Sequence, residues 1–127
     1  MSQDLPHLIW VDCEMTGLDI NKDALVEIAV LVTDAQLNVL GEGVDLVIKC
    51  EQAKLDAMDD FVKNMHTSSG LITQIPNGTT LAKADELIIA YLKRYAPAAG
   101  KSPLAGNSVY VDRAFIARDL PLSLIHI

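Results

Sequence analysis

The sequence is short of basic residues. It has 10 Lys and Arg against 17 Asp and Glu in 127 residues, which gives a formal net charge of −7 at pH 7. Binding of long nucleic acids without sequence preference depends on many Lys and Arg contacts to phosphates. The charge therefore argues against tight binding of a long polyanion, although it does not exclude a ligand of a few nucleotides.

Long apolar runs and cysteines are scarce as well. The longest helical apolar run, residues 87–92, is far too short to span a bilayer, and residues 1–7 lack the basic region of a secretion signal. Cys13 and Cys50 lie in strand-like apolar segments, which predicts two reduced core residues rather than a disulfide or a metal-binding pair. We therefore expect a cytoplasmic protein that makes no contact with a membrane.

What is present fits one α/β domain. Half of the residues are hydrophobic, and the sequence contains no linker-like segment, repeat or low-complexity stretch. Period-2 and period-3.6 patterns predict an antiparallel meander of three strands, then two helices and a strand that returns to the sheet. The predicted strands are residues 8–14, 25–33, 39–49 and 104–107, and the predicted helices are residues 55–65 and 80–95.

Two carboxylates stand at the end of the first predicted strand. Asp12 and Glu14 are two residues apart, so in a strand they project from the same face. Like charges this close are unfavourable unless a cation neutralises them, and an all-oxygen site suits Mg²⁺ or Mn²⁺ better than Zn²⁺. The alternative is a strand end that emerges into solvent, where acidic residues are common.

A third carboxylate lies far along the chain. Residues 105–115 predict a short strand, a turn at 106–108 and a helix with Asp112 in its early part. An acidic residue there can simply stabilise the helix N-terminus. A carboxylate on a helix can also converge with a strand-borne pair on the same metal ions.

Six sequence words occur in a fixed order over residues 8 to about 120. They are LIWVDCEMTGL (8–18), VEIAVLVTD (26–34), MDDF (58–61), HTSSGL (66–71), GKSPLAGNS (100–108) and DRAF (112–115). In this order they resemble the oligoribonucleases of the DEDD, or DnaQ-like, 3′-to-5′ exonuclease superfamily. The resemblance implies a ribonuclease H-like fold, in which helices flank a mixed sheet.

The resemblance also implies an activity. Members degrade RNA fragments of a few nucleotides to mononucleotides, act as homodimers, and use two divalent ions, Mg²⁺ or Mn²⁺, for hydrolysis. Asp12, Glu14 and Asp112 match the catalytic metal ligands. The implied substrate contacts are Leu18 against the bases, Phe61 and His66 near the 3′-terminal base, and Asn107 and Ser108 near the phosphate or sugar.

Each implied substrate contact has a purely structural alternative. Leu18 could pack within its loop, and Phe61 could be a core residue of its helix. His66 could be a polar residue at a helix end. Ser108 could cap the following helix through its hydroxyl.

The sequence departs from the family pattern near its end. The family continues with a Tyr and a His-x-x-x-x-Asp segment that supply the general base and a fourth carboxylate, and residues 1–127 contain no match to it. We therefore expect an exonuclease domain over 1–120 with a C-terminally incomplete sheet, a non-native or disordered tail over 121–127, and little or no activity. We also expect uncovered apolar surface around Phe115, Ile116 and Leu120.

Three other functions stay open. A DNA proofreading exonuclease of the same superfamily would share Asp12 and Glu14, but the words at 58–61 and 66–71 favour an oligoribonuclease. A haloacid-dehalogenase-type phosphatase needs an Asp where this chain has Glu14. The third alternative is an inactive fragment that only binds metal or a partner.

Overall fold

Three antiparallel strands and one short parallel strand form the sheet, in the order β3-β2-β1-β4. Strands β1, β2 and β3 make the predicted meander, and β4 runs parallel to β1. The bounds are β1 (Leu8–Met15), β2 (Leu25–Thr33), β3 (Val39–Val47) and β4 (Leu104–Ala105). This is a computed structural model that describes residues 5–127, so residues 1–4 of the predicted domain lie outside the described residues. The mixed α/β sheet is confirmed.

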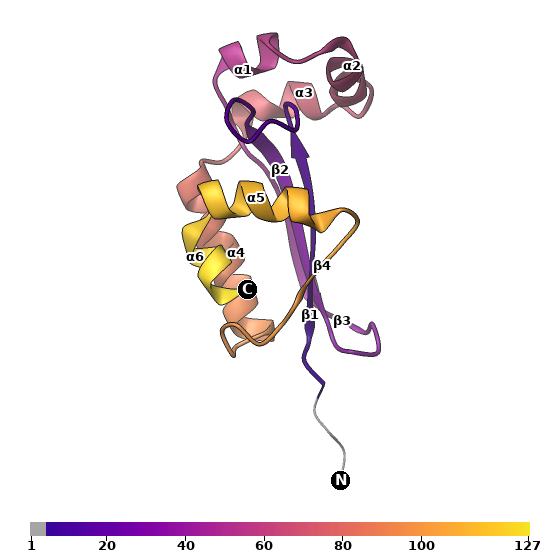
Figure 1. The fold of residues 1–127 in the computed structure, drawn as a ribbon, viewed down its shortest axis with the longest axis vertical. Helices are drawn as coiled ribbons and strands as arrows, with labels where there is room; N and C mark the ends of the chain where they lie inside the picture. The colour runs from indigo at the N-terminus through magenta and orange to yellow at the C-terminus, as the bar shows by residue number, and fades with distance from the viewer. Residues whose placement is uncertain (1–4) are drawn as a thin grey trace.

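The helices cover one face of this sheet and one end of it. Helices α4, α5 and α6 lie along one face, while α1, α2 and α3 gather beyond the end where β1 stops (Figure 1). The bounds are α1 (Gln52–Asp56), α2 (Asp60–Ser68), α3 (Leu71–Gln74), the 3₁₀ helix η1 (Ile75–Asn77), α4 (Leu81–Tyr95), α5 (Val109–Asp119) and α6 (Pro121–His126). None of these helices is long and apolar enough to cross a membrane within the described residues.

Strand alternation separates a buried face from an open face. In β1 the odd-numbered residues, such as Ile9 and Val11, are buried under the helices, whereas Asp12 is exposed. In β2, Ile28 and Val30 join the same core, together with Phe115 of α5. A smaller cluster beneath α1–α3 holds that end of the sheet. The even-numbered residues of β1 are therefore left on a face that no helix covers.

The helix predicted over 55–65 is wrong in its bounds, because the chain makes two helices there. α1 ends at Asp56, and α2 begins after Asp59, whose carboxylate accepts a hydrogen bond from the Val62 amide. An N-cap of this kind satisfies a free amide and starts a new helix. The segment therefore contains two separate short helices instead of one.

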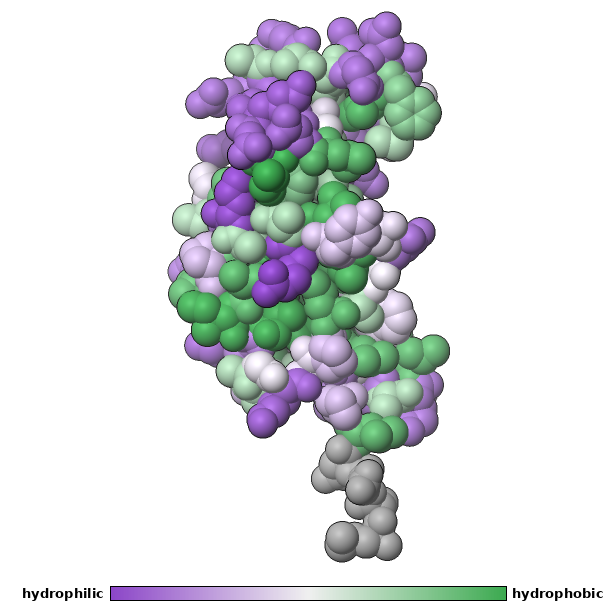
Figure 2. Space-filling model, viewed as in Figure 1, coloured by the Kyte–Doolittle hydropathy of each residue, from purple (hydrophilic) through white to green (hydrophobic). Residues whose placement is uncertain are grey.

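The C-terminal region also differs from expectation. Phe115, Ile116 and Leu120 are buried in the main core rather than uncovered. For residues 121–127 we expected a non-native or disordered tail. Residues 121–126 form helix α6, which packs against α4 and α5, and the non-native origin of the segment stays a prediction. Figure 2 shows apolar residues across the middle of this view, and on α6 the exposed ones are Leu122 and Ile125.

Candidate active site

The three predicted catalytic carboxylates come from two elements that touch each other. Asp12 and Glu14 stand on the open face of β1, Asp12 exposed and Glu14 half-buried. Asp112 lies in the first turn of α5, which packs against β1, and only 6% of its surface is exposed. A carboxylate is this buried only when its surroundings compensate it.

The three carboxylates influence one another through their charges. The pKa of Asp112 is raised to about 6, first by burial and then by the negative charge of Asp12. The pKa of Glu14 is raised by burial, lowered by neighbouring His66 and raised again by Asp12. Like charges raise each other's pKa because each disfavours ionisation of the other. A nearby cation would relieve this repulsion.

Cys13 lies beside the carboxylate of Asp112. Hydrogen bonding from the Cys13 amide and thiol lowers the pKa of Asp112 against the other effects. Burial, followed by the charges of Asp112 and Asp12, raises the pKa of the Cys13 thiol, so the thiol stays protonated. Cys13 therefore acts as a donor to Asp112 and not as a thiolate ligand.

Sequence reasoning missed two further acids on the open face. Glu27 of β2 is directly opposite Glu14 in the strand register. Asp45 of β3 is opposite Ala29, two residues along β2 from Glu27, and so lies on the same face. The pKa of Glu27 is raised to about 7, first by burial and then by a hydrogen bond with Asp45. The signal was present as single acids within apolar strands, but it needed the cross-strand register to be interpreted. The two form an acidic row with Asp12 and Glu14.

A cleft of ≈ 570 Å³ opens over this face beside Asp12. Its wall includes Trp10, Asp45 and the 106–107 turn. Gly106 runs so close to β1 that a Cβ there would lie 2.7 Å from the Val11 carbonyl oxygen. The absence of a side chain at Gly106 thus brings Asn107 into the same cleft as Asp12.

Ser108 does not cap α5 as its structural alternative predicts. It occupies the N-cap position, but it is left-handed, with φ of 50°, and its side chain makes no capping hydrogen bond. Among residues 5–127, the one hydrogen bond of its hydroxyl goes to the side-chain oxygen of exposed Asn107, at 3.4 Å. Both polar side chains are therefore available beside the carboxylates, and their contact with a phosphate or sugar stays a prediction.

Leu18 and Phe61 are too exposed for their structural alternatives. Leu18, on the β1–β2 loop, is 75% exposed, and Phe61, on α2, is 77% exposed. Neither packs into the core, so two large apolar side chains face solvent near the end of β1. Their contact with bases stays a prediction.

His66 has a different environment. It is 1% exposed, and its Nε2 donates a hydrogen bond to the Met15 carbonyl oxygen at 2.8 Å. This contact joins α2 to the end of β1 beside Glu14. The base contact predicted for His66 stays a prediction, and the structure gives the ring a supporting role.

The donor set fits a hard divalent ion, because all three predicted ligands are carboxylates. Among residues 5–127, however, no three His, Cys, Asp or Glu side chains are already gathered closely enough to hold one ion. The shared metal site of Asp12, Glu14 and Asp112 therefore stays a prediction.

The chain is similar in sequence to known exonucleases. The sequence pattern of the exonuclease family RNase_T matches residues 9–127. An oligoribonuclease of Cutibacterium acnes is 56% identical over 114 residues, which cover 90% of this chain and 56% of that protein. An oligoribonuclease of Streptomyces griseus is 54% identical over 114 residues, covering 90% and 57%. The chain thus spans just over half the length of these curated relatives.

A solved structure is also similar. Exonuclease I from Methylocaldum szegediense matches with a TM-score of 0.64 at 23% identity, over 91% of this chain and 23% of that chain. At this identity the likeness shows the fold alone. It supports the DnaQ-like arrangement of the sheet and its flanking helices, and it carries no information about substrate.

Proposed function

Since the chain belongs to the RNase_T exonuclease family, we propose that it hydrolyses short oligoribonucleotides to mononucleotides from the 3′ end, with two Mg²⁺ or Mn²⁺ ions. The observation that carries the proposal is the set of three interacting carboxylates, Asp12, Glu14 and Asp112, on adjoining elements. The relatives above, named oligoribonucleases, support the choice of substrate.

The carboxylates would hold the ions. Asp12, Glu14 and Asp112 would supply the ligands, and the charge of Asp12 acts on both Glu14 and Asp112. When bound, divalent ions in such a site activate water and stabilise the leaving oxygen of a phosphodiester. Ion binding requires ionised carboxylates, so the raised pKa values of Glu14 and Asp112 predict weaker binding at lower pH.

Exposed side chains around the carboxylates would hold the substrate. The rings and methyl groups of Phe61 and Leu18 offer stacking surfaces, and one base–aromatic stack contributes about 1–3 kcal/mol. Asn107 and Ser108 offer polar groups to the phosphate or sugar. A net charge of −7 disfavours long RNA, which agrees with a substrate of a few nucleotides.

The location and partners follow the same reasoning. Cys13 and Cys50 are both free, which agrees with a reducing cytoplasm. Short oligoribonucleotides are the proposed ligands. A homodimer stays a prediction, and the apolar residues of α5 that we expected to promote association are buried.

A single-turnover assay tests the proposal. The chain, in excess over an end-labelled diribonucleotide with Mn²⁺, is expected to release a labelled mononucleotide only very slowly, because residues 1–127 contain no match to the family's general base and fourth carboxylate. Asp12→Asn is expected to abolish this release. A deoxydinucleotide compared under the same conditions separates an oligoribonuclease from a DNA exonuclease. Manganese-dependent binding of the diribonucleotide without any product would instead favour a binding role. If the chain neither binds the diribonucleotide nor releases product, the proposal is contradicted.

A further inference from the structure

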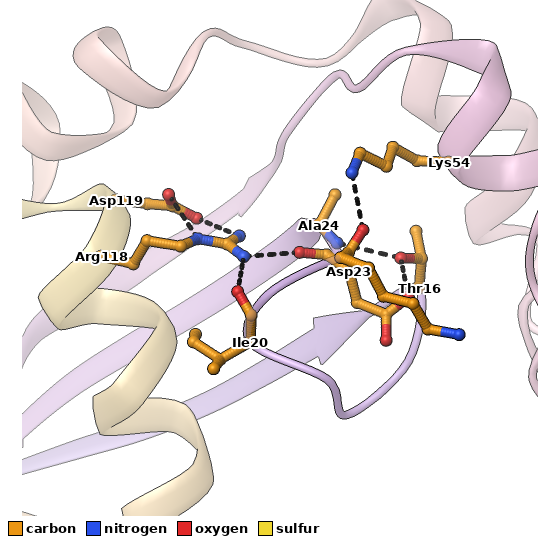
Figure 3. Close-up of polar contacts among 8 residues, drawn as sticks. Thr16, Ile20, Asp23, Ala24, Lys54, Arg118 and Asp119 are labelled. Carbon is orange, nitrogen blue, oxygen red and sulfur yellow. Dashed lines mark hydrogen bonds and ion pairs between the residues drawn. The ribbon is translucent and has the colours of Figure 1, made fainter.

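Arg118, near the end of α5, reaches across to the loop that joins β1 to β2 (Figure 3). Its Nη1 donates hydrogen bonds to the carbonyl oxygens of Ile20 and Asp23, both at 2.7 Å. Its Nε and Nη2 donate to the two carboxylate oxygens of Asp119 at 2.9 and 2.7 Å. The guanidinium carbon also lies 4.9 Å from the centre of the Phe115 ring. The side chain is therefore held on its own helix while it binds the loop.

The loop itself is internally fixed. The carboxylate of Asp23 accepts hydrogen bonds from the Thr16 hydroxyl at 3.1 Å and from the Asp19 amide at 2.9 Å. The Thr16 hydroxyl in turn accepts from the Ala24 amide at 2.9 Å. Gly17 lies directly against the Asp23 carboxylate, with no room for a Cβ. These bonds join the loop into one hydrogen-bonded body, so a contact at Asp23 also restrains the turn that carries Leu18.

Leu18 projects from this body, while Asp112 lies on the helix that carries Arg118. On the opposite side of the loop, Lys54 of α1 donates to the Lys22 carbonyl oxygen at 2.6 Å. Arg118 supplies the side-chain contact between the loop and α5 in Figure 3. It thereby links the predicted base-contacting residue to the predicted metal-binding helix.

We propose that Arg118 is a positioning residue that fixes where Leu18 lies relative to Asp112. The inference rests on the proposed function, because the substrate contact of Leu18 belongs to it. Arg118 is outside the predicted metal ligands and the predicted substrate contacts. Its role is to hold Leu18, the predicted base contact, at a constant position relative to the predicted metal ligands. Small displacements of such groups strongly reduce reactivity.

Lysine cannot replace this arginine. Guanidinium has five N–H groups in a planar fork, and here the fork serves two carbonyls and one carboxylate together. An ammonium group has three donors at one point. Arg118→Lys thus keeps the charge but loses the simultaneous contacts. Arg94→Lys is a matched control, because the Arg94 guanidinium also lies over a ring, 5.4 Å from the centre of Tyr95, but on α4.

The test measures loop protection and ligand affinity on the whole chain. Hydrogen exchange is followed at the amides of Asp19, Lys22 and Asp23, which are hydrogen-bonded within the loop. Affinity is measured with a hydrolysis-resistant phosphorothioate diribonucleotide in Mn²⁺. The variants are Arg118→Lys, Leu18→Ala, the double variant and Arg94→Lys.

Arg118→Lys is expected to speed hydrogen exchange of these amides about tenfold and to lower the affinity for the diribonucleotide by a similar factor. Arg94→Lys is expected to change neither quantity. The double variant is expected to bind no more weakly than the weaker single variant, because a displaced Leu18 has little contact left to lose. Unchanged exchange in Arg118→Lys, or strictly additive losses of affinity, would overturn the inference while leaving the proposed function intact. Absence of diribonucleotide binding by the unmodified chain would instead refute the proposed function, and with it the role of Arg118 in positioning Leu18 for the substrate.

Discussion

The two faces of the sheet are made by the same strands but serve different ends. Ile28 and Glu27 are neighbours in β2, yet Ile28 is buried in the main core and Glu27 belongs to the acidic row on the open face. Burial of apolar area stabilises the fold, whereas crowded carboxylates destabilise it. The comparison teaches that one strand can supply stability from its odd or even positions and chemistry from the others. The free energy gained by apolar burial on one face is expected to offset the electrostatic cost of the carboxylates on the other face.

The sharpest way to break this comparison is to exchange the roles of neighbours. Ile28→Ala is expected to lower the free energy of unfolding by about 2–5 kcal/mol, because it opens a cavity in the core. Glu27→Gln is expected to raise it in metal-free buffer, since it removes a like charge. Denaturant titration measures both. A destabilising Glu27→Gln would mean that the open face is not under electrostatic strain.

A second prediction concerns exposed apolar residues. Phe61→Ala is expected to weaken diribonucleotide binding in Mn²⁺ by about 1–3 kcal/mol with no loss of stability, because the ring is exposed and its proposed contact is a base. Val39→Ala, which alters another exposed apolar side chain on β3, is the control. Equal affinity in Phe61→Ala and the unmodified chain would remove Phe61 from the binding surface.

The third prediction follows from the pKa of Asp112. Its folded-state value of about 6 lies above the ordinary 3.8, so the folded protein binds this proton more tightly than the unfolded chain does. The contribution of the protonated Asp112 carboxyl to folding stability is fully present below pH 3.8 and is lost as pH rises through about 6. Relative to Asp112→Asn, the metal-free protein should therefore lose stability between about pH 4 and about pH 7.

Thermal unfolding across this pH range measures that difference. Glu86→Gln, on an exposed position of α4, is the control for removing one negative charge. A difference between the unmodified chain and Asp112→Asn that grows in the opposite direction would show that the Asp112 carboxylate is stabilised, not strained, in the fold.

The smallest predicted effect is at Ser108. Ser108→Gly is expected to raise stability by up to about 1 kcal/mol, because glycine adopts the left-handed backbone of this residue without strain and no capping bond is lost. The same change should lower the affinity for the diribonucleotide if the Ser108 hydroxyl contacts this ligand. Denaturant titration and calorimetry give the two values, and a clear loss of stability would contradict the absence of a cap.

The sequence predicts the sheet well because alternation is a local property. The period-2 pattern of residues 25–33 and the Asp12 and Glu14 pair specify which side chains share a face before any partner is known. The break between α1 and α2 was missed, because the apolar pattern continues through it while the Asp59 cap decides it. Local patterns also leave open which acids of different strands become neighbours.

Contacts between distant segments account for what was missed in the candidate site. Glu27 meets Glu14 only through the strand register, and Arg118 meets the carbonyl of Ile20 across 98 positions of chain. The burial of His66 against Met15 depends on how α2 packs at the end of β1. None of these pairings has a local signal, so they needed the folded chain.

The central claim is that Asp12, Glu14 and Asp112 act together as ligands of divalent ions. Titration of Mn²⁺ into the metal-free chain, with free Mn²⁺ measured by electron paramagnetic resonance, tests it most directly. We predict that the unmodified chain binds Mn²⁺ and that Asp12→Asn, Glu14→Gln and Asp112→Asn each weaken binding about tenfold or more, while Glu86→Gln has no effect. Binding that is unchanged in Asp112→Asn would contradict the claim, because the helix-borne carboxylate would then lie outside the site.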